Sequence, residues 1–190
     1  MCGSSILPGA PPAKTRLPFL RTRETHLPTR DDVLIYETEP LKRALDVVGP
    51  LSAMLFAASS APDTDFTAAL VDVFPGGGCH FVQEGIGRAR WRESDVTPTM
   101  IEPGEVHEYT IDLWATAHSF APGHRVRLEI SSSNFDRYDR NPNTGHPFGQ
   151  DAERRPAAQT IFHDAARPSR ITLPVLERAA MRGRSGSTTA

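Results

Sequence analysis

The chain has 190 residues, of which 38% are hydrophobic and 23% charged, which is enough for one domain with a buried core. Its 21 basic and 23 acidic side chains leave a formal net charge of −2, which argues against nucleic acid as a partner. There is no run of about 18 apolar residues, so we expect neither a membrane span nor a membrane partner. The first thirty residues do not resemble a signal peptide, and a soluble cytoplasmic protein is expected.

Both ends of the sequence predict disordered or extended arms. Residues 1–30 contain five prolines and scattered charges, with no apolar period of 2 or 3.6. Residues 178–190 end in a run of Gly, Ser and Thr that is equally unlike a packed element. We therefore expect one folded domain over residues 31–177.

The folded part shows the alternation that is typical of half-buried strands. Apolar and polar residues alternate in two segments, 106–114 and 125–130, and a Pro-Gly pair that favours a type II turn precedes each. Similar patterns predict strands at 33–38, 45–48, 51–58, 66–74, 79–83, 86–92, 159–163 and 169–176. Short strands at this spacing, without long amphipathic helices, predict an all-β fold, an antiparallel β-sandwich of the jelly-roll type.

The residue types that carry catalysis are present, but not in the patterns that catalysis needs. No serine lies in the Gly-x-Ser-x-Gly elbow of α/β-hydrolases, and we interpret Ser131–Ser133 as strand-end hydroxyls bonded to backbone. The seven histidines form no His-x-His or His-x-x-x-His pair, so most are expected to be surface or edge-strand imidazoles. Cys2 and Cys79 give no disulfide framework. We expect no catalytic residue, no metal and no cofactor.

Two loops combine acidic or amide side chains with aromatic residues. Residues 139–145 carry oxygen-bearing side chains at alternate positions, as calcium loops do, but the glycine comes late and Gln150 stands where a glutamate is needed. We interpret this segment as a compact loop held by Asx turns. Asp63 and Asp65 stand two residues apart, and a turn leading into the buried strand that starts at Phe66 explains them better than acid–base catalysis.

Several long stretches of the sequence, in order, resemble the C-terminal β-sandwich domain of the cocaine-esterase and X-prolyl dipeptidyl-peptidase (CocE/NonD) family of serine hydrolases. They are DDVLIYETEPL (31–41), VVGPLSAMLFAASSAPDTDFTAALVDVFPGG (47–77), GIGRARWRES (85–94), IEPGEVHEYTIDLWATAHSFAPGHRVRLEISSSNFDRYDRNPNTG (101–145) and SRITLPVL (169–176). In that family the domain follows an α/β-hydrolase domain that bears a Ser-Asp-His triad, packs against it and helps to wall the substrate cleft. The resemblance implies ester, acyl or peptide hydrolysis by a parent enzyme, and it carries no triad residue onto this chain.

The resemblance predicts a non-catalytic domain, inactive alone, whose partner is a catalytic α/β-hydrolase domain or subunit, or a second copy of itself. We expect the contact to involve the two loops, because each combines an aromatic anchor with turn-forming polar residues: Asp63, Asp65, Phe66, Phe135, Tyr138, Asn141 and Asn143. An alternative is a free-standing binding module, for example for carbohydrate. Trp91 and Trp114 would then form its platform, but both lie inside predicted strands, where burial would remove them from the surface. A metal-dependent hydrolase built on the histidines is a third hypothesis.

Overall fold

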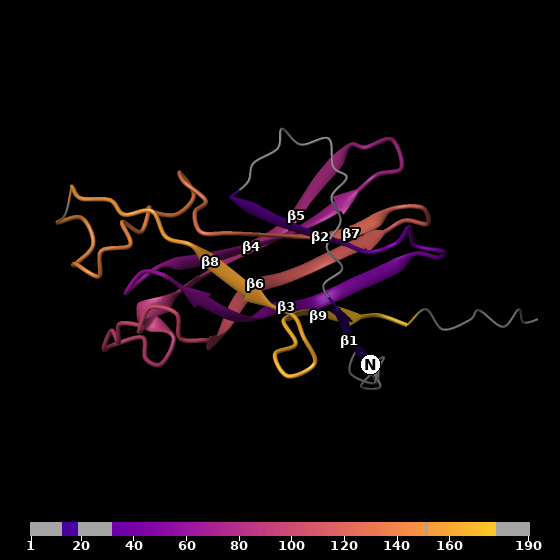
Figure 1. Cartoon of the computed structure of the whole chain (residues 1–190). Coiled ribbons are helices and arrows are strands. Elements are labelled where there is room, and N and C mark those ends of the chain that lie inside the picture. Colours follow the sequence, from indigo (N-terminus) through magenta and orange to yellow (C-terminus); the bar gives the residue numbers. More distant parts are fainter. Residues whose placement is uncertain (1–12, 19–31, 151, 178–190) are drawn as a thin grey trace, which may run out of the picture.

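The computed structural model describes residues 13–18, 32–150 and 152–177, which form two layers of antiparallel strands (Figure 1). Sheet A has the strand order β1 (Ala13–Pro18), β9 (Arg170–Val175), β3 (Leu45–Ser59) and β6 (His107–Phe120), and β8 (Gln159–Phe162) pairs with one end of β3. Sheet B has the order β2 (Val33–Glu37), β7 (Arg125–Ser131), β4 (Asp65–Val73) and β5 (Cys79–Arg88). Within the described segments the only helix is a 3-10 turn, η1 (Ala89–Trp91). The predicted antiparallel β-sandwich is confirmed.

The core lies between the sheets and is built from alternate residues of their strands. In β6 the buried residues are Tyr109, Ile111 and Leu113, as the period-2 pattern predicted. They face a matching set from sheet B, to which β4 and β7 contribute side chains that are also almost inaccessible: Phe66, Ala68, Leu70, Val126, Leu128 and Ile130. Burial of these two apolar faces against each other is the main source of the domain's stability.

The predicted turns before β6 and β7 are confirmed by backbone geometry. Gly104 has φ +88° and Gly123 has φ +84°, values that glycine adopts without the steric cost that other residues incur. The sequence predicted separate strands at 45–48 and 51–58, divided by the Gly49-Pro50 pair, and here the prediction was wrong. Gly49 adopts φ +126° inside the single strand β3, which continues through an irregularity between Pro50 and Ser52.

Part of the predicted N-terminal arm is a paired strand. Residues 13–18 form β1, in which Ala13 lies opposite Val175 and Pro18 lies opposite Arg170 of β9. The strand is at the edge of sheet A, where proline is tolerated, which explains why its sequence has no clear strand signal. The rest of the predicted arm and the tail at 178–190 lie outside the described residues. None of the described helices has the length and apolarity that a membrane crossing requires.

The two sheets come into direct contact where β5 of sheet B meets β6 of sheet A. A Cβ atom placed on Gly85 would lie 2.0 Å from the carbonyl oxygen of Asp112. Two residues earlier on β5, the Gln83 side chain donates a hydrogen bond of 3.1 Å to the carbonyl oxygen of Ala115. The absence of a side chain at Gly85 therefore allows the two backbones to meet and closes this side of the sandwich.

Candidate functional site

The two loops selected from the sequence meet in a buried polar network. The carboxylate of Asp63 accepts hydrogen bonds from the backbone N–H of Arg90 at 3.1 Å and from its guanidinium at 2.8 Å. The Asn141 amide donates at 2.8 Å to both Asp63 and Asp65. Arg88 lies 3.6 Å from the other oxygen of Asp65. The network holds the loop of Asn141 against the ends of β4 and β5.

Arg88 and Arg90 also contact Phe148, which lies further along the loop of Asn141. Their guanidinium groups both lie over the ring of Phe148, at 4.5 Å for Arg88 and 4.3 Å for Arg90. The backbone N–H of Asn143 donates to the side-chain oxygen of Asn141 at 2.9 Å, which confirms the predicted Asx turn. Asn143 also donates to the carbonyl oxygen of Arg155, so it joins two parts of the loop.

Asp63, Asp65 and Phe66 do not lie on the surface, so the predicted contact of these residues with another domain has no exposed side chain at these positions. Asp63 has no exposed area, Asp65 is 1% exposed, and the Phe66 ring packs on Tyr109 at 4.9 Å. The predicted turn into a buried strand that starts at Phe66 agrees with β4, but the two carboxylates are buried as well, although paired carboxylates are normally solvated. Here the partners of the carboxylates, above all Arg90, make their burial tolerable.

Two predicted contact residues do reach the surface. Phe135 is 59% exposed, and the guanidinium of Arg140 lies 4.3 Å from the centre of its ring. Tyr138 is half-buried, and its backbone N–H donates to the carbonyl oxygen of Asn134. Asn141 and Asn143 instead hold the loop together. Of the seven residues, Phe135 and Tyr138 are therefore the ones that stay candidates for contact with a partner.

Burial raises the pKa of Asp65 from an ordinary 3.8 to about 6, although the hydrogen bond from Asn141 and the charge of Arg88 oppose the shift. The folded state therefore binds a proton more tightly than the unfolded chain does. Stability is lost as the pH rises from about 4 to about 6, by up to about 3 kcal/mol.

Asp65→Asn is expected to remove this loss and flatten the dependence of stability on pH. The free energy of unfolding by urea at pH 4, 5, 6 and 7 tests it; parallel curves for the two proteins would contradict it.

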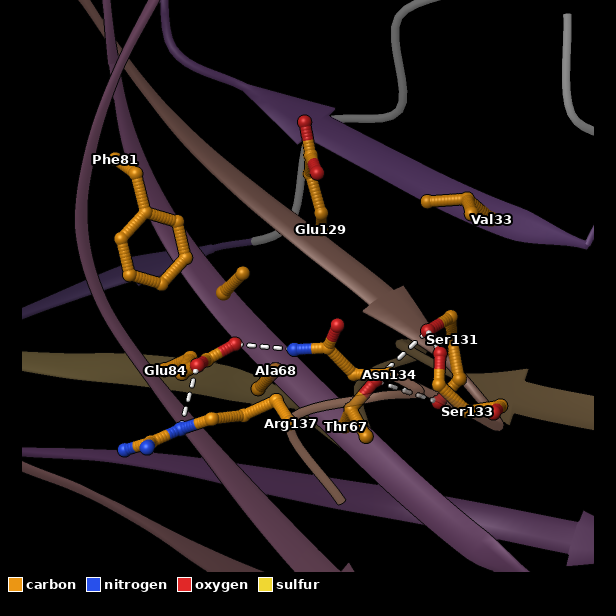
Figure 2. Close-up of a pocket in the computed structure, with 11 residues that line it drawn as sticks. Val33, Thr67, Ala68, Phe81, Glu84, Glu129, Ser131, Ser133, Asn134 and Arg137 are labelled. Atoms are coloured by element: carbon orange, nitrogen blue, oxygen red, sulfur yellow. Dashed lines mark hydrogen bonds and ion pairs between the residues drawn. The ribbon is translucent and has the colours of Figure 1, made fainter. Parts of the chain in front are cut away.

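A cavity of about 350 Å³ lies on the outer face of sheet B, the face turned away from the core (Figure 2). Glu84 is central in it: its carboxylate accepts a hydrogen bond from the Asn134 side chain and pairs with Arg137 at 3.1 Å. The hydroxyls of Thr67 and Ser131 lie 2.7 Å apart, and Ser131 donates to the carbonyl oxygen of Ser133. The polar groups of this cavity thus bond to one another.

The lining of this cavity does not suit nucleophilic catalysis. A serine becomes a nucleophile when a neighbouring base, usually a histidine, takes its proton. No histidine is among the residues that line the cavity, and Ser131 is bonded to backbone, as predicted. The cavity therefore offers hydroxyl and carboxylate groups for binding but no base beside its serines.

Two histidines converge on one buried carboxylate at the end of the sandwich. His118 and His124 lie 3.0 Å and 2.9 Å from the two oxygens of Asp72, which is 2% exposed. The ring of His80 stacks on His118 with 5.5 Å between centroids. This cluster was not predicted, because its members come from β4, β5, β6 and the turn before β7, and a charged residue in the apolar strand β4 is the one available signal. In the segments that the structure describes, no group of three or more His, Cys, Asp and Glu has the geometry to hold a metal ion.

The sequence predicted both tryptophans inside strands, and the structure confirms this for Trp114 and not for Trp91. Trp91 is in η1 rather than in a strand and is half-buried. Trp114 is in β6, but its side chain is 66% exposed, and its backbone has φ +61°. A non-glycine residue with positive φ is uncommon, and for a bulky residue it marks a turn or local strain.

Both the sequence and the fold are similar to those of known proteins. Residues 7–172 match the X-Pro dipeptidyl-peptidase C-terminal non-catalytic domain. The chain belongs to this family. It is 50% identical over 151 residues to cocaine esterase from Rhodococcus sp. strain MB1 Bresler, an alignment that covers 78% of this chain and 26% of the esterase.

Solved structures agree with this family assignment. An aminopeptidase from a marine sediment archaeon, Thaumarchaeota archaeon, superposes with a TM-score of 0.75 and 35% identity over 84% of this chain and 28% of its own. An α-amino acid ester hydrolase gives a TM-score of 0.75 and 34% identity, over 83% of this chain and 27% of its own. The chain therefore spans about a quarter of the length of these relatives.

Membership of the X-Pro dipeptidyl-peptidase C-terminal non-catalytic domain family confirms the resemblance found in the sequence. The matched region begins at residue 7 and so includes β1, which joins sheet A beside β9. A non-catalytic domain also fits the described chemistry. The serines in the sheet B cavity have no histidine beside them, and His118 and His124 are bonded to Asp72.

Proposed function

We propose that this chain acts as the structural, non-catalytic domain of a serine hydrolase. It packs on a catalytic α/β-hydrolase domain, helps to wall the substrate cleft of that domain, and hydrolyses nothing alone. The observation that carries the proposal is the match of residues 7–172 to a domain family described as non-catalytic. The catalytic domain belongs to the same polypeptide or to a separate subunit, and pairing with a second copy of this chain is the alternative. A cytoplasmic location also stays a prediction, which cell fractionation tests.

The names of the similar proteins support a substrate class for the parent enzyme. They are an esterase, an aminopeptidase and an amino acid ester hydrolase. These activities share attack on an ester or amide carbonyl, which requires a nucleophile, a base and oxyanion donors held in fixed positions. We propose ester or peptide hydrolysis for the parent enzyme, with every one of those groups supplied by the catalytic domain.

The purified chain is expected to release no product from p-nitrophenyl butyrate or from an Xaa-Pro p-nitroanilide above the rate in buffer. The physical reason is that the serines of its cavity have no base beside them. Absorbance at the p-nitrophenolate and p-nitroaniline bands measures it, with full-length cocaine esterase as the positive control for the ester. Hydrolysis by the chain that a serine-reactive phosphonate blocks would refute the proposal.

A chimera tests the structural role directly. In this chimera the present chain replaces the matching quarter of cocaine esterase. Because that quarter is 50% identical, we expect kcat/KM within about tenfold of the parent esterase, a difference of about 1.4 kcal/mol. The esterase without the domain is the matched control and is expected to lose activity. A chimera no more active than this truncated enzyme would contradict the proposal.

One observation favours the carbohydrate-binding alternative: Trp114 is exposed and available for stacking on a sugar ring. The other tryptophan, Trp91, is half-buried in η1, so the two do not repeat along one strand as a platform would. Calorimetric titration with cellohexaose and xylohexaose distinguishes the two functions. Heat of binding that disappears in Trp114→Ala would favour the carbohydrate module.

A further inference from the structure

Trp114 occupies the extra position of a β-bulge. The ladder between β3 and β6 changes register between Pro50 and Ser52, and β6 has one more residue than β3 at that point. Trp114 adopts φ +61° there, and its backbone N–H donates to the Asp112 carboxylate at 2.8 Å. Positive φ at a bulge is the position for which glycine is the usual residue.

The stability of the isolated domain does not account for a tryptophan at this position. Its backbone conformation is unfavourable for a residue with a Cβ atom, and most of its side chain stays in water. Glycine would form the same bulge without either disadvantage. A backbone outlier that also carries an exposed large aromatic ring points to a role outside the domain.

The residues around Trp114 extend this exposed apolar area. Two cross-strand pairs adjoin the bulge on the face of sheet A that points away from the core, Val48 opposite Ala117 and Pro50 opposite Ala115. All four are exposed, whereas the neighbouring Val47 is fully buried on the core side. We name Val48, Pro50, Trp114, Ala115 and Ala117 the bulge surface. An exposed apolar surface that includes a large aromatic side chain is a frequent feature of protein interfaces.

We propose that the bulge surface is the docking site for the catalytic α/β-hydrolase domain, with Trp114 as its anchor. This inference rests on the proposed function and assigns the contact to one face of the sandwich. In the family the domain is C-terminal, so the catalytic part of those enzymes precedes it. The segment that enters the domain from that side reaches β1, which belongs to sheet A, the same sheet that carries the bulge surface.

The dimensions fit a single interface. Three inter-strand spacings separate β1 from β6, which is about 14 Å. A standard interface of about 800 Å² per partner, if roughly circular, is about 32 Å across, which exceeds the distance from β1 to β6. The remaining three quarters of the relatives' length is large enough to cover the face from the tether at β1 to the bulge surface. Another exposed aromatic residue, Phe135, lies on the loop after β7, and its ring already contacts the Arg140 guanidinium.

Two variants at one position separate docking from folding. Trp114→Gly suits the bulge backbone, and Trp114→Ala removes the ring but keeps a Cβ atom. In the isolated chain we expect Trp114→Gly to unfold at the same or a higher urea concentration than wild type, and higher than Trp114→Ala. In the chimera with the catalytic part of cocaine esterase, both variants are expected to shorten the half-life of activity at 45 °C by about tenfold.

Val96→Ala is the matched control, since Val96 is 86% exposed and lies on the loop after η1. It is expected to change neither measurement.

If Trp114→Gly lowers the urea midpoint of the isolated chain as well as the half-life of the chimera, Trp114 is a structural residue and the inference is wrong. If Phe135→Ala shortens the half-life and Trp114→Gly does not, the contact is the loop, and the proposed function survives without the inference. An isolated chain that sediments as a dimer, and as a monomer with Trp114→Gly, would identify a second copy as the occupant and overturn the assignment. A parent chimera that lacks activity refutes the proposed function itself.

Discussion

Asp63→Ala is expected to destabilise the domain by about 3–5 kcal/mol, because it leaves the Arg90 guanidinium buried without its counter-charge. The two side chains are 0% and 5% exposed, and Asp63 is also a hydrogen-bond acceptor for Asn141. Urea denaturation followed by circular dichroism measures the loss. Because the network holds the loop of Asn141, limited proteolysis within residues 133–150 is expected to accelerate in the same variant.

The controls separate the buried charge from the loss of a contact. Replacing both partners, Asp63→Leu with Arg90→Met, is expected to recover most of the lost stability, since no charge is then left unpaired in the interior. Asp164 and Arg167 form an ion pair of 2.7 Å on the surface, close to the 2.8 Å of the buried pair of Asp63 and Arg90. Asp164→Asn is expected to leave the urea midpoint unchanged. An Asp63→Ala protein that unfolds at the wild-type urea concentration would show that Arg90 finds solvent or another partner.

The second large effect is expected for Gly85→Ala. The added Cβ would lie 2.0 Å from the backbone carbonyl oxygen of Asp112, and a backbone atom in a paired strand cannot rotate away. Strands β5 and β6 would have to separate where the two sheets meet. Overpacked sites of this kind lose about 1–3 kcal/mol, and a clash with backbone belongs at the upper end. The free energy of unfolding by urea measures it.

Two other glycines supply a graded comparison. At Gly87 the nearest atom to an added Cβ is a side-chain carbon of Ile111 at 3.1 Å, which can move, so Gly87→Ala is expected to cost less than Gly85→Ala. At Gly76 no atom lies within 4 Å, and Gly76→Ala is expected to leave stability unchanged or slightly raised. Equal losses at the three positions would mean that glycine itself, rather than the approach of β6, matters at Gly85.

The strands could be predicted from the sequence because their cause is local. In β6 the alternation of Tyr109, Ile111 and Leu113 with polar neighbours follows from one buried face, and the turn before it follows from the φ preferences of Pro103 and Gly104. The continuity of β3 through Gly49 could not be predicted in the same way. A glycine with positive φ serves a turn and a bulge equally well, and only the pairing with β6 and β9 decides between them.

The candidate site was predicted in outline and not in its contacts. Asp63 and Asn141 were both selected, yet the residue that joins their loops to the fold, Arg90, has no local signal and lies 27 positions from Asp63. The convergence of His118 and His124 on Asp72 could not be predicted for the same reason, because the three residues are far apart in the sequence. Whether a carboxylate is buried depends on which cation the fold brings to it, and a single sequence does not contain that information.

The pairing of β1 with β9 has a practical consequence. Ala13 lies directly opposite Val175, so the first and last strands of the described fold begin and end side by side. A unit with adjacent ends can be inserted into a surface loop of a host protein without stretching the host. The same adjacency makes the sandwich a candidate for circular permutation, with new ends opened at the turn of Gly76 and the old ones joined by a short glycine linker.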